Sequence, residues 1–252
     1  MKGKKGKIIT VTSTKGGVGK TITTLNLAGT YSHLGLKTLV IDLDLYGGAV
    51  ATYLNSSIEK TIFNLAEDLA NNRYEKMEDY FYSYNENIDI IAAPKDPRMA
   101  SKIDAKCIPI ILNNVVYKYD VILVDTSHLL NEINITVLDN SDSILYIFTN
   151  DTFDLKNTRS FMSIMKDVGY DNYYTLLNES FLFNKTYYSH FDIRNLIGNN
   201  IDFTLSKSMY VKEIDKYIIE GNILVLNKNI SLNKKDYEKL KNMALKLLGK
   251  EN

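Results

Sequence analysis

A glycine-rich segment near the start of the chain has the residue types needed to bind a polyphosphate. It occupies residues 14–21, reads TKGGVGKT, and lies between a short apolar run and an amphipathic stretch. Glycines let consecutive backbone N–H groups point at one anion, and a helix that begins after such a loop adds the positive end of its dipole. In this pattern Lys20 reaches the β- and γ-phosphates, and the Thr21 hydroxyl is a ligand for Mg²⁺. The segment therefore predicts a phosphate-binding loop, although Thr14 stands where the general pattern has its first glycine.

Acidic side chains stand at the ends of two further apolar, β-branched runs. One run ends in Asp42 and Asp44, and the other, residues 119–126, carries Asp125 near its end. A carboxylate at the carboxyl end of a strand beside a phosphate loop holds Mg²⁺, directly or through water, or orients a water. We therefore expect Asp125 and Thr21 to be the magnesium ligands. Asp42 is expected to be structural or to lie near the metal.

Short apolar runs alternate with longer amphipathic stretches along the whole chain. Several runs are apolar on consecutive residues, as strands buried on both faces of a parallel sheet are. This order predicts an α/β fold with a doubly wound, mostly parallel sheet and helices on both faces, whose ligands bind beyond the carboxyl ends of the strands. The predicted strands are 8–13, 38–42, 88–92, 120–125, 143–149, 173–177 and 222–226. The predicted helices are 20–33, 62–70, 97–116, 132–139, 154–168, 211–220 and 234–248.

The composition is that of an ordinary globular chain, because 45% of its 252 residues are apolar and 24% are charged. This excludes global disorder. Thirty basic residues balance thirty acidic ones, which argues against a surface that is one continuous polyanion-binding field but leaves room for a local basic patch. Cys107 is the sole cysteine, so the chain has no internal disulfide, and a reducing cytoplasmic location is expected. We expect one domain over residues 1–252, with a basic lead-in at 1–6 and a C-terminal helix within 233–249.

The loop resembles the deviant Walker A signature of the MinD/ParA class of P-loop ATPases. That signature, Lys-Gly-Gly-x-Gly-Lys-Thr, stands here as residues 15–21, and the resemblance extends from residue 7 to residue 248. It implies an ATPase that binds ATP or ADP with Mg²⁺ and forms a homodimer with ATP. Lys15 would then reach across the dimer to the partner's nucleotide, the alternative being a solvent-facing charge near the anion. Asp44 matches the residue that positions the attacking water, so the implied catalytic residues are Lys15, Lys20 and Asp44.

The resemblance also implies a residue that binds the adenine base of the nucleotide. It further shows one place where this chain departs from the family. Asn178 follows an apolar run, where an asparagine of the family binds the adenine edge, the alternative being a turn residue. The family usually has Thr-Pro-Pro after the Asp125 position, whereas this chain has Thr126-Ser127-His128, so a looser loop is expected. We interpret His128 as a polar loop residue rather than a catalytic base. The residues implied to bind nucleotide are Lys15, Gly16, Gly17, Val18, Gly19, Lys20, Thr21, Thr23 and Asn178.

Within the class, the chain looks most similar to the CpaE/TadZ group of pilus-assembly localisation ATPases. The similar segments are residues 42–54, 90–97 and 131–138. That group usually carries a receiver-like domain before the ATPase, and here we expect it to be absent because the phosphate loop comes almost at once. One alternative is a ParA-like partition ATPase that binds DNA non-specifically as an ATP dimer, and another is a degenerate nucleotide-binding scaffold.

The resemblance leaves the partners open. It implies an unidentified protein partner. The amphipathic, lysine-rich C-terminal helix is expected to pack on the sheet, with peripheral contact to an anionic membrane as the alternative.

Overall fold

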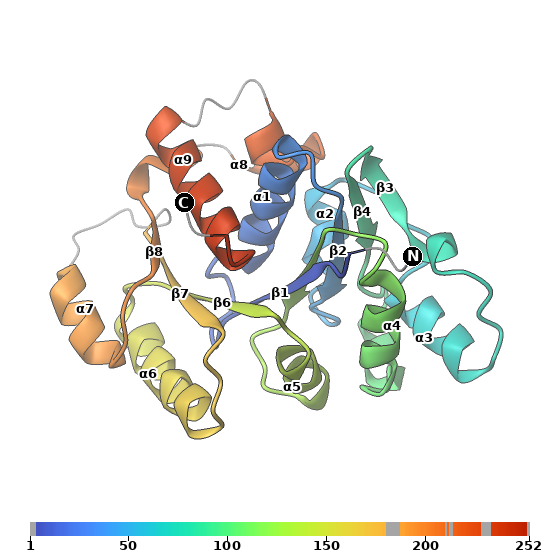
Figure 1. Cartoon of the computed structure of the whole chain (residues 1–252), viewed down its shortest axis with the longest axis horizontal. Helices are drawn as coiled ribbons and strands as arrows, with labels where there is room; N and C mark the ends of the chain where they lie inside the picture. Colours follow the sequence, from blue (N-terminus) through green and yellow to red (C-terminus); the bar gives the residue numbers. More distant parts are fainter. Residues whose placement is uncertain (1–3, 180–186, 210, 212–213, 228–232, 251–252) are drawn as a thin grey trace.

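The chain folds around one eight-stranded sheet whose strand order is β3-β4-β2-β5-β1-β6-β7-β8 (Figure 1). The computed structural model describes residues 4–179, 187–209, 211, 214–227 and 233–250. All neighbouring strands run parallel except the pair β3–β4. The strands are β1 (Lys7–Thr12), β2 (Thr38–Leu43), β3 (Tyr82–Asn85), β4 (Ile88–Ile91), β5 (Val121–Thr126), β6 (Ser143–Phe148), β7 (Tyr173–Asn178) and β8 (Phe203–Leu205). The predicted doubly wound α/β fold is confirmed.

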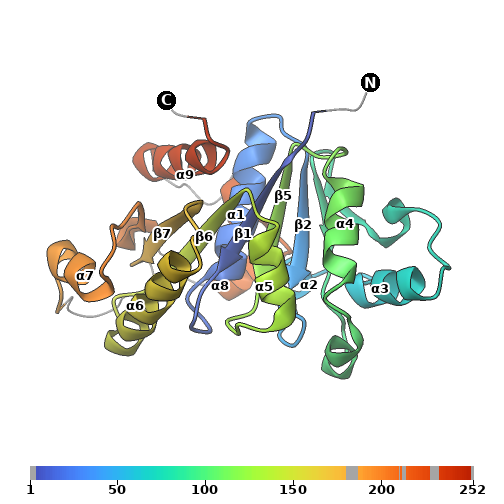
Figure 2. The ribbon, with the colours of Figure 1, turned by 60° about the horizontal axis from the view of Figure 1, so that its bottom comes forward.

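Helices cover both faces of the sheet, and the turned view in Figure 2 brings α4, α5 and α6 in front of it. One face carries α1 (Lys20–His33), α2 (Ala49–Tyr53), α8 (Ile214–Ile219) and α9 (Lys234–Leu247). The other carries α3 (Ile62–Ala70), α4 (Cys107–Val115), α5 (Glu132–Asp139), α6 (Thr152–Asp167) and α7 (His190–Ile197). The central strands are buried on both faces, as their unbroken apolar runs predict.

The core divides according to the alternation of side chains along each strand. In β1, Ile9 and Val11 pack towards α1 and α9, whereas Ile8 packs with the helices of the opposite face. In β5, Leu123 joins the first cluster, while Ile122 and Val124 join the second. Because neighbouring side chains point to opposite faces of a sheet, each central strand anchors both helical layers and fixes where its carboxyl end lies.

Two predicted elements differ from the structure. The run 222–226 is not a strand: Leu224–Leu226 is a 3-10 helix that packs on α1 beside Gly29, so its apolar residues are buried against a helix. The predicted helix 97–116 is interrupted. A 3-10 helix, Pro97–Lys102, ends in the extended residue Ile103, and the Asp104 carboxylate then accepts a hydrogen bond from the backbone of Lys106 before α4 begins.

Several short elements were not predicted. They are α2, α7, β3 and β8. The structure describes α8 from Ile214, and two residues of the predicted helix 211–220 lie outside the described residues. Helix α7 does have a sequence signal, because Ser189 and Asp192 form a capping box at its start.

The C-terminal helix α9 buries its apolar side against α1 and the sheet. Leu240, Met243 and Ala244 are buried there, and the Tyr31 hydroxyl donates to the Ala244 carbonyl over 2.9 Å. The Ser143 hydroxyl at the start of β6 donates to the Leu247 carbonyl. The apolar face of α9 is therefore covered within the molecule. In the part of the chain that the structure describes, no helix combines the length and apolarity that crossing a membrane requires.

Candidate functional site

The phosphate loop joins β1, the central strand, to the N-terminus of α1. Gly17 and Gly19 have φ angles of +73° and +98°, a left-handed conformation that side-chain-bearing residues rarely adopt. Gly19 is also the N-cap of α1, and it supplies no side-chain cap to the first N–H groups of the helix. Helix N-terminal N–H groups without a cap, behind a glycine turn, form an anion-binding arrangement.

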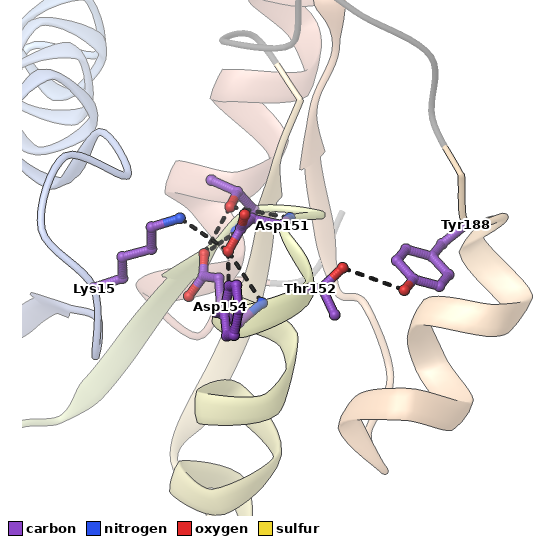
Figure 3. Close-up of polar contacts among 7 residues, drawn as sticks. Lys15, Asp151, Thr152, Asp154 and Tyr188 are labelled. Carbon is purple, nitrogen blue, oxygen red and sulfur yellow. Dashed lines mark hydrogen bonds and ion pairs between the residues drawn. The ribbon is translucent and has the colours of Figure 1, made fainter.

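The two lysines of the loop leave it in different directions. Lys20 is buried, and its Nζ donates to Ser13 Oγ over 3.1 Å. Burial lowers the pKa of Lys20, and the nearby charges of Asp125, Asp44 and Asp154 oppose this shift. Lys15 is 41% exposed and extends instead to the start of α6, where its Nζ lies 3.1 Å from Asp151 Oδ1 (Figure 3). The Lys20 side chain thus lies in the interior of the site, whereas the Lys15 side chain lies on its open side.

Asp125 and Thr21 meet at the base of the loop. The Thr21 hydroxyl donates to Asp125 Oδ2 over 2.6 Å, and the Thr24 hydroxyl lies 3.4 Å from Oδ1. Asp42 is the register partner of Asp125 on β2, and both carboxyls are fully buried. Burial, followed by repulsion from the neighbouring carboxylates, raises the pKa of both groups. A bound cation would favour the charged form of both carboxyls and so oppose this shift of their pKa.

The donor set at this position fits Mg²⁺. Carboxylate and hydroxyl oxygens are its preferred ligands, and Mg²⁺ is usually held by one or two carboxylates together with substrate phosphates and water. Among the described residues, no three or more His, Cys, Asp or Glu side chains gather as a protein-only metal site. The residues thus fit a site in which the nucleotide would supply part of the coordination and in which Thr21 and Asp125 would be the protein ligands.

Asp44 lies in a turn that Asp42 organises. The two oxygens of Asp42 accept hydrogen bonds from the backbone N–H groups of Asp44 and Val50, over 3.0 and 3.1 Å. The Asp44 carboxylate folds back over its own turn and accepts the Gly47 N–H over 3.3 Å. Its charge still acts on Lys20 and Asp125, so it lies beside the expected position of the phosphates.

The loop after β5 is held by hydrogen bonds where the family has prolines. Asn134 of α5 donates from Nδ2 to Ser127 Oγ over 2.8 Å and to the Leu129 carbonyl over 2.6 Å. A buried amide thus ties this loop to α5 where the family has prolines, and the expectation of a looser loop stays a prediction. His128 is exposed, as expected for a polar loop residue, and its ring lies over Gly16.

Asn178 contacts the phosphate loop itself. Its Nδ2 donates to the Val18 carbonyl over 2.9 Å, so the end of β7 is tied to the backbone of the loop. Beside it lies a cavity of about 60 Å³, room for about two waters. Thr23 of α1 lines this cavity, and its hydroxyl is buried with no hydrogen-bond partner in the described structure. An unpartnered buried hydroxyl is a feature that a ligand could satisfy.

Sequence reasoning missed four residues that shape the site. They are Ser13, which accepts from Lys20, Thr24 beside Asp125, Asn134 behind the loop after β5, and Asp151 against Lys15. Asp151 stands three residues after the last residue of β6, so the rule that residues just beyond strand ends form the site would have pointed to it. Asn134 lies inside a helix, where no sequence signal marks it.

This geometry defines a P-loop nucleotide-binding site on a doubly wound sheet, and comparison with known proteins agrees. Residues 6–183 match the family described as AAA domain (AAA_31). The chain belongs to this family, which is the MinD/ParA class of P-loop ATPases, and its members usually hydrolyse ATP.

Relatives and solved structures of the class share sequence and fold with this chain. An uncharacterised ATP-binding protein of Methanocaldococcus jannaschii is 30% identical over 148 residues, which is 59% of this chain and 55% of that protein. The chain spans about half the length of the first curated relatives it matches. A ParA family ATPase from Chlorobium tepidum has a TM-score of 0.81 at 17% identity, over 95% of this chain and 98% of that one. A plasmid partition protein from Borrelia burgdorferi, bound to AMPPNP, has a TM-score of 0.75 at 25% identity, over 96% and 99%.

Proposed function

We propose that this chain is an ATP-dependent dimerisation switch formed by one domain. ATP with Mg²⁺ at the phosphate loop would bring two copies face to face, and slow hydrolysis would separate them. The observation that carries the proposal is that the side chains of the two lysines leave the loop in different directions. Lys20 is buried beneath the loop, whereas Lys15 lies partly exposed on the open side, against Asp151, where a second subunit would approach. A sheet built from both halves of the chain supports treating residues 1–252 as one domain.

Each implied site residue has a role that its position allows. Lys20 would neutralise the terminal phosphates from within, and Thr21 with Asp125 would hold Mg²⁺, whose charge stabilises the phosphate oxygens during transfer. Lys15 would add a positive charge from the partner subunit, as an arginine finger does. Asp44 would position the attacking water. The catalytic contribution is therefore positioning and charge.

The base would bind beside Asn178 and Thr23. Residues from Gly16 to Gly19 would hold the phosphates through their backbone N–H groups, and the cavity next to Thr23 lies on the side of α1 towards β8. The Asn178 amide would then share its hydrogen bonds between the loop and the adenine edge.

The test is the oligomeric state, measured by size-exclusion chromatography with light scattering. With Mg²⁺ and ATP we expect the wild type to shift to a dimer and Asp44→Ala to accumulate as a dimer, because it binds but cannot turn over. Lys20→Ala should lose nucleotide binding, whereas Lys15→Ala should keep binding and lose dimerisation or turnover. Lys235→Ala, an exposed lysine of α9, is the matched control and should behave as the wild type. A monomeric Asp44→Ala variant at saturating ATP would refute the switch.

The cellular task that we propose is the positioning or assembly of a larger machine, as in the CpaE/TadZ group, through a partner that binds one nucleotide state. The second candidate is partition on DNA. It is favoured by the similarity to the plasmid partition protein and by the exposed lysines Lys234, Lys235 and Lys246 of α9. A gel shift of non-specific DNA that appears only with ATP and weakens with salt would support it. Phosphate release no faster than that of Lys20→Ala would instead indicate a degenerate scaffold.

A further inference from the structure

The residue that faces Lys15 is fixed in place by its own surroundings. Asp151 is the N-cap of α6, and its Oδ1 accepts hydrogen bonds from the N–H groups of Phe153 and Asp154, each over 3.1 Å. One turn on, the buried Asp154 carboxylate accepts the N–H and the hydroxyl of Thr149, each over 2.7 Å. The short segment between β6 and α6 is therefore held at both ends, and the Asp151 carboxylate has little freedom to move (Figure 3).

Lys15 is paired with this fixed carboxylate. Its Nζ lies 3.1 Å from Asp151 Oδ1, the same oxygen that caps α6, and within the described ranges no other acidic side chain lies within ion-pair distance of Lys15. The two side chains are 41% and 44% exposed, so solvent screens the pair. Such a pair is weak enough to open at modest cost.

We propose that Asp151 holds Lys15 within its own subunit and that this ion pair must open before Lys15 can reach the partner's nucleotide. The inference rests on the proposed dimerisation switch. One ammonium group cannot stay at Asp151 and also reach phosphates across the interface. After release, Asp151 keeps both backbone N–H donors and remains a satisfied cap, so only the ion pair is lost. A polyphosphate concentrates more negative charge than one carboxylate, which makes the exchange favourable once ATP is bound in the partner.

The exposure of the ion pair sets the size of its expected effect on dimerisation. An exposed ion pair of this kind changes an equilibrium by a factor of about 1.4 to 5. Dimerisation opens one pair in each subunit, so the two factors multiply. Removing the Asp151 charge should therefore lower the dissociation constant of the nucleotide-bound dimer by about two- to thirty-fold.

The test uses Asp151→Asn, because asparagine is as good an N-cap as aspartate and keeps the acceptor for Phe153 and Asp154 while removing the charge. The matched control is Asp96→Asn. Asp96 also caps a helix and forms an exposed ion pair, with Arg98, but it does so on the 3-10 helix Pro97–Lys102. Dimer dissociation constants are measured by analytical ultracentrifugation with Mg²⁺ and AMPPNP, which excludes effects of turnover. We expect tighter dimers for Asp151→Asn, no change for Asp96→Asn, and no gain when Asp151→Asn is added to Lys15→Ala.

The outcomes separate this inference from the switch itself. A wild type that dimerises while Asp151→Asn dimerises equally or more weakly overturns the inference and leaves the switch standing. Failure of every variant to dimerise overturns both. A second measurement needs no dimer: hydrogen bonds from the Asp154 N–H and from Lys15 hold the pKa of Asp151 below its usual range. NMR titration of the nucleotide-free protein should show a higher Asp151 pKa in Lys15→Gln, and an unchanged pKa would show that the pair does not form in solution.

Discussion

Replacing Asp125 by asparagine should make the nucleotide-free protein more stable at alkaline pH while impairing its response to magnesium. Asp125 is fully buried beside the equally buried Asp42, with Thr21 donating to it over 2.6 Å. Burial is the largest cause that raises its pKa from 3.8 to about 7. Asparagine keeps an oxygen acceptor for Thr21 and removes the buried charge.

The sign follows from proton linkage. A carboxyl whose pKa is raised on folding destabilises the folded state above its unfolded pKa, so the free energy of unfolding falls as pH rises from about 4 through the raised value. With pKa values of 3.8 and about 7, the wild type should lose about 3 kcal/mol between pH 4.5 and pH 8 through this group. Asparagine has no such dependence, although its new N–H₂ group costs about 1–3 kcal/mol if it finds no acceptor. We therefore expect the variant to be less stable than the wild type at pH 4.5 and more stable at pH 8.

The assay is urea unfolding with EDTA at both pH values, followed by unfolding at pH 8 with Mg²⁺ and ADP. Ligand at about one hundred times its dissociation constant should stabilise the wild type by about 2.7 kcal/mol. The variant should gain less, because one magnesium ligand is gone. Asp120→Asn is the control, since this exposed residue precedes the same strand and its carboxylate only accepts the Lys37 N–H. Parallel pH profiles for wild type and Asp125→Asn would refute the reasoning.

Two further predictions concern the supports of the site. Gly29→Ala should destabilise the fold by about 1–3 kcal/mol in urea unfolding. The reason is that the added Cβ would lie 2.9 Å from Ile223 Cγ2 and closer still to Val225. A gain in stability of about 1 kcal/mol, which is usual when alanine replaces an exposed helical glycine, would contradict this prediction. Asn134→Ala should cost about 1–3 kcal/mol and speed amide hydrogen exchange in residues 127–130, because it removes the hydrogen bonds to Ser127 and Leu129. Unchanged exchange there would show that the loop is held by other contacts.

The sequence predicted best those elements whose boundaries local chemistry determines. The helix from Lys20 to His33 was predicted with the bounds that the structure has, because the glycine-rich loop marks its start. The ends of the central strands were predicted within a residue or two. These strands are apolar on consecutive residues, whereas a half-buried strand alternates apolar and polar residues. The run 222–226 failed because a short apolar segment buries equally well against a helix or a sheet, and only the packing partner decides.

The site was predictable where a motif specifies its residues and not where the fold brings together distant segments. Thr21 and Asp125 come from two motifs that the sequence already connects with magnesium, and the structure places them in contact. Asp151 belongs to no motif, and its link to Lys15 depends on β1 and β6 being neighbours, which the sequence alone does not establish. Asn134 supports the site through a buried amide on a helix, where polar residues carry no positional signal.

The strand order would let one loop take part in both the nucleotide binding and the dimerisation that we propose. β1, which carries the loop, lies between β5, which carries Asp125 near its end, and β6, which is followed by the segment that carries Asp151. The neighbour on one side supplies the carboxylate that contacts Thr21, and the neighbour on the other side begins the turn that holds Lys15. In a parallel sheet these carboxyl ends lie at one edge, so both contacts reach opposite ends of the same loop. In the switch that we propose, binding would thus act through Lys20, Thr21 and Asp125 without disturbing the Lys15–Asp151 pair, which would leave that pair to respond to the second subunit.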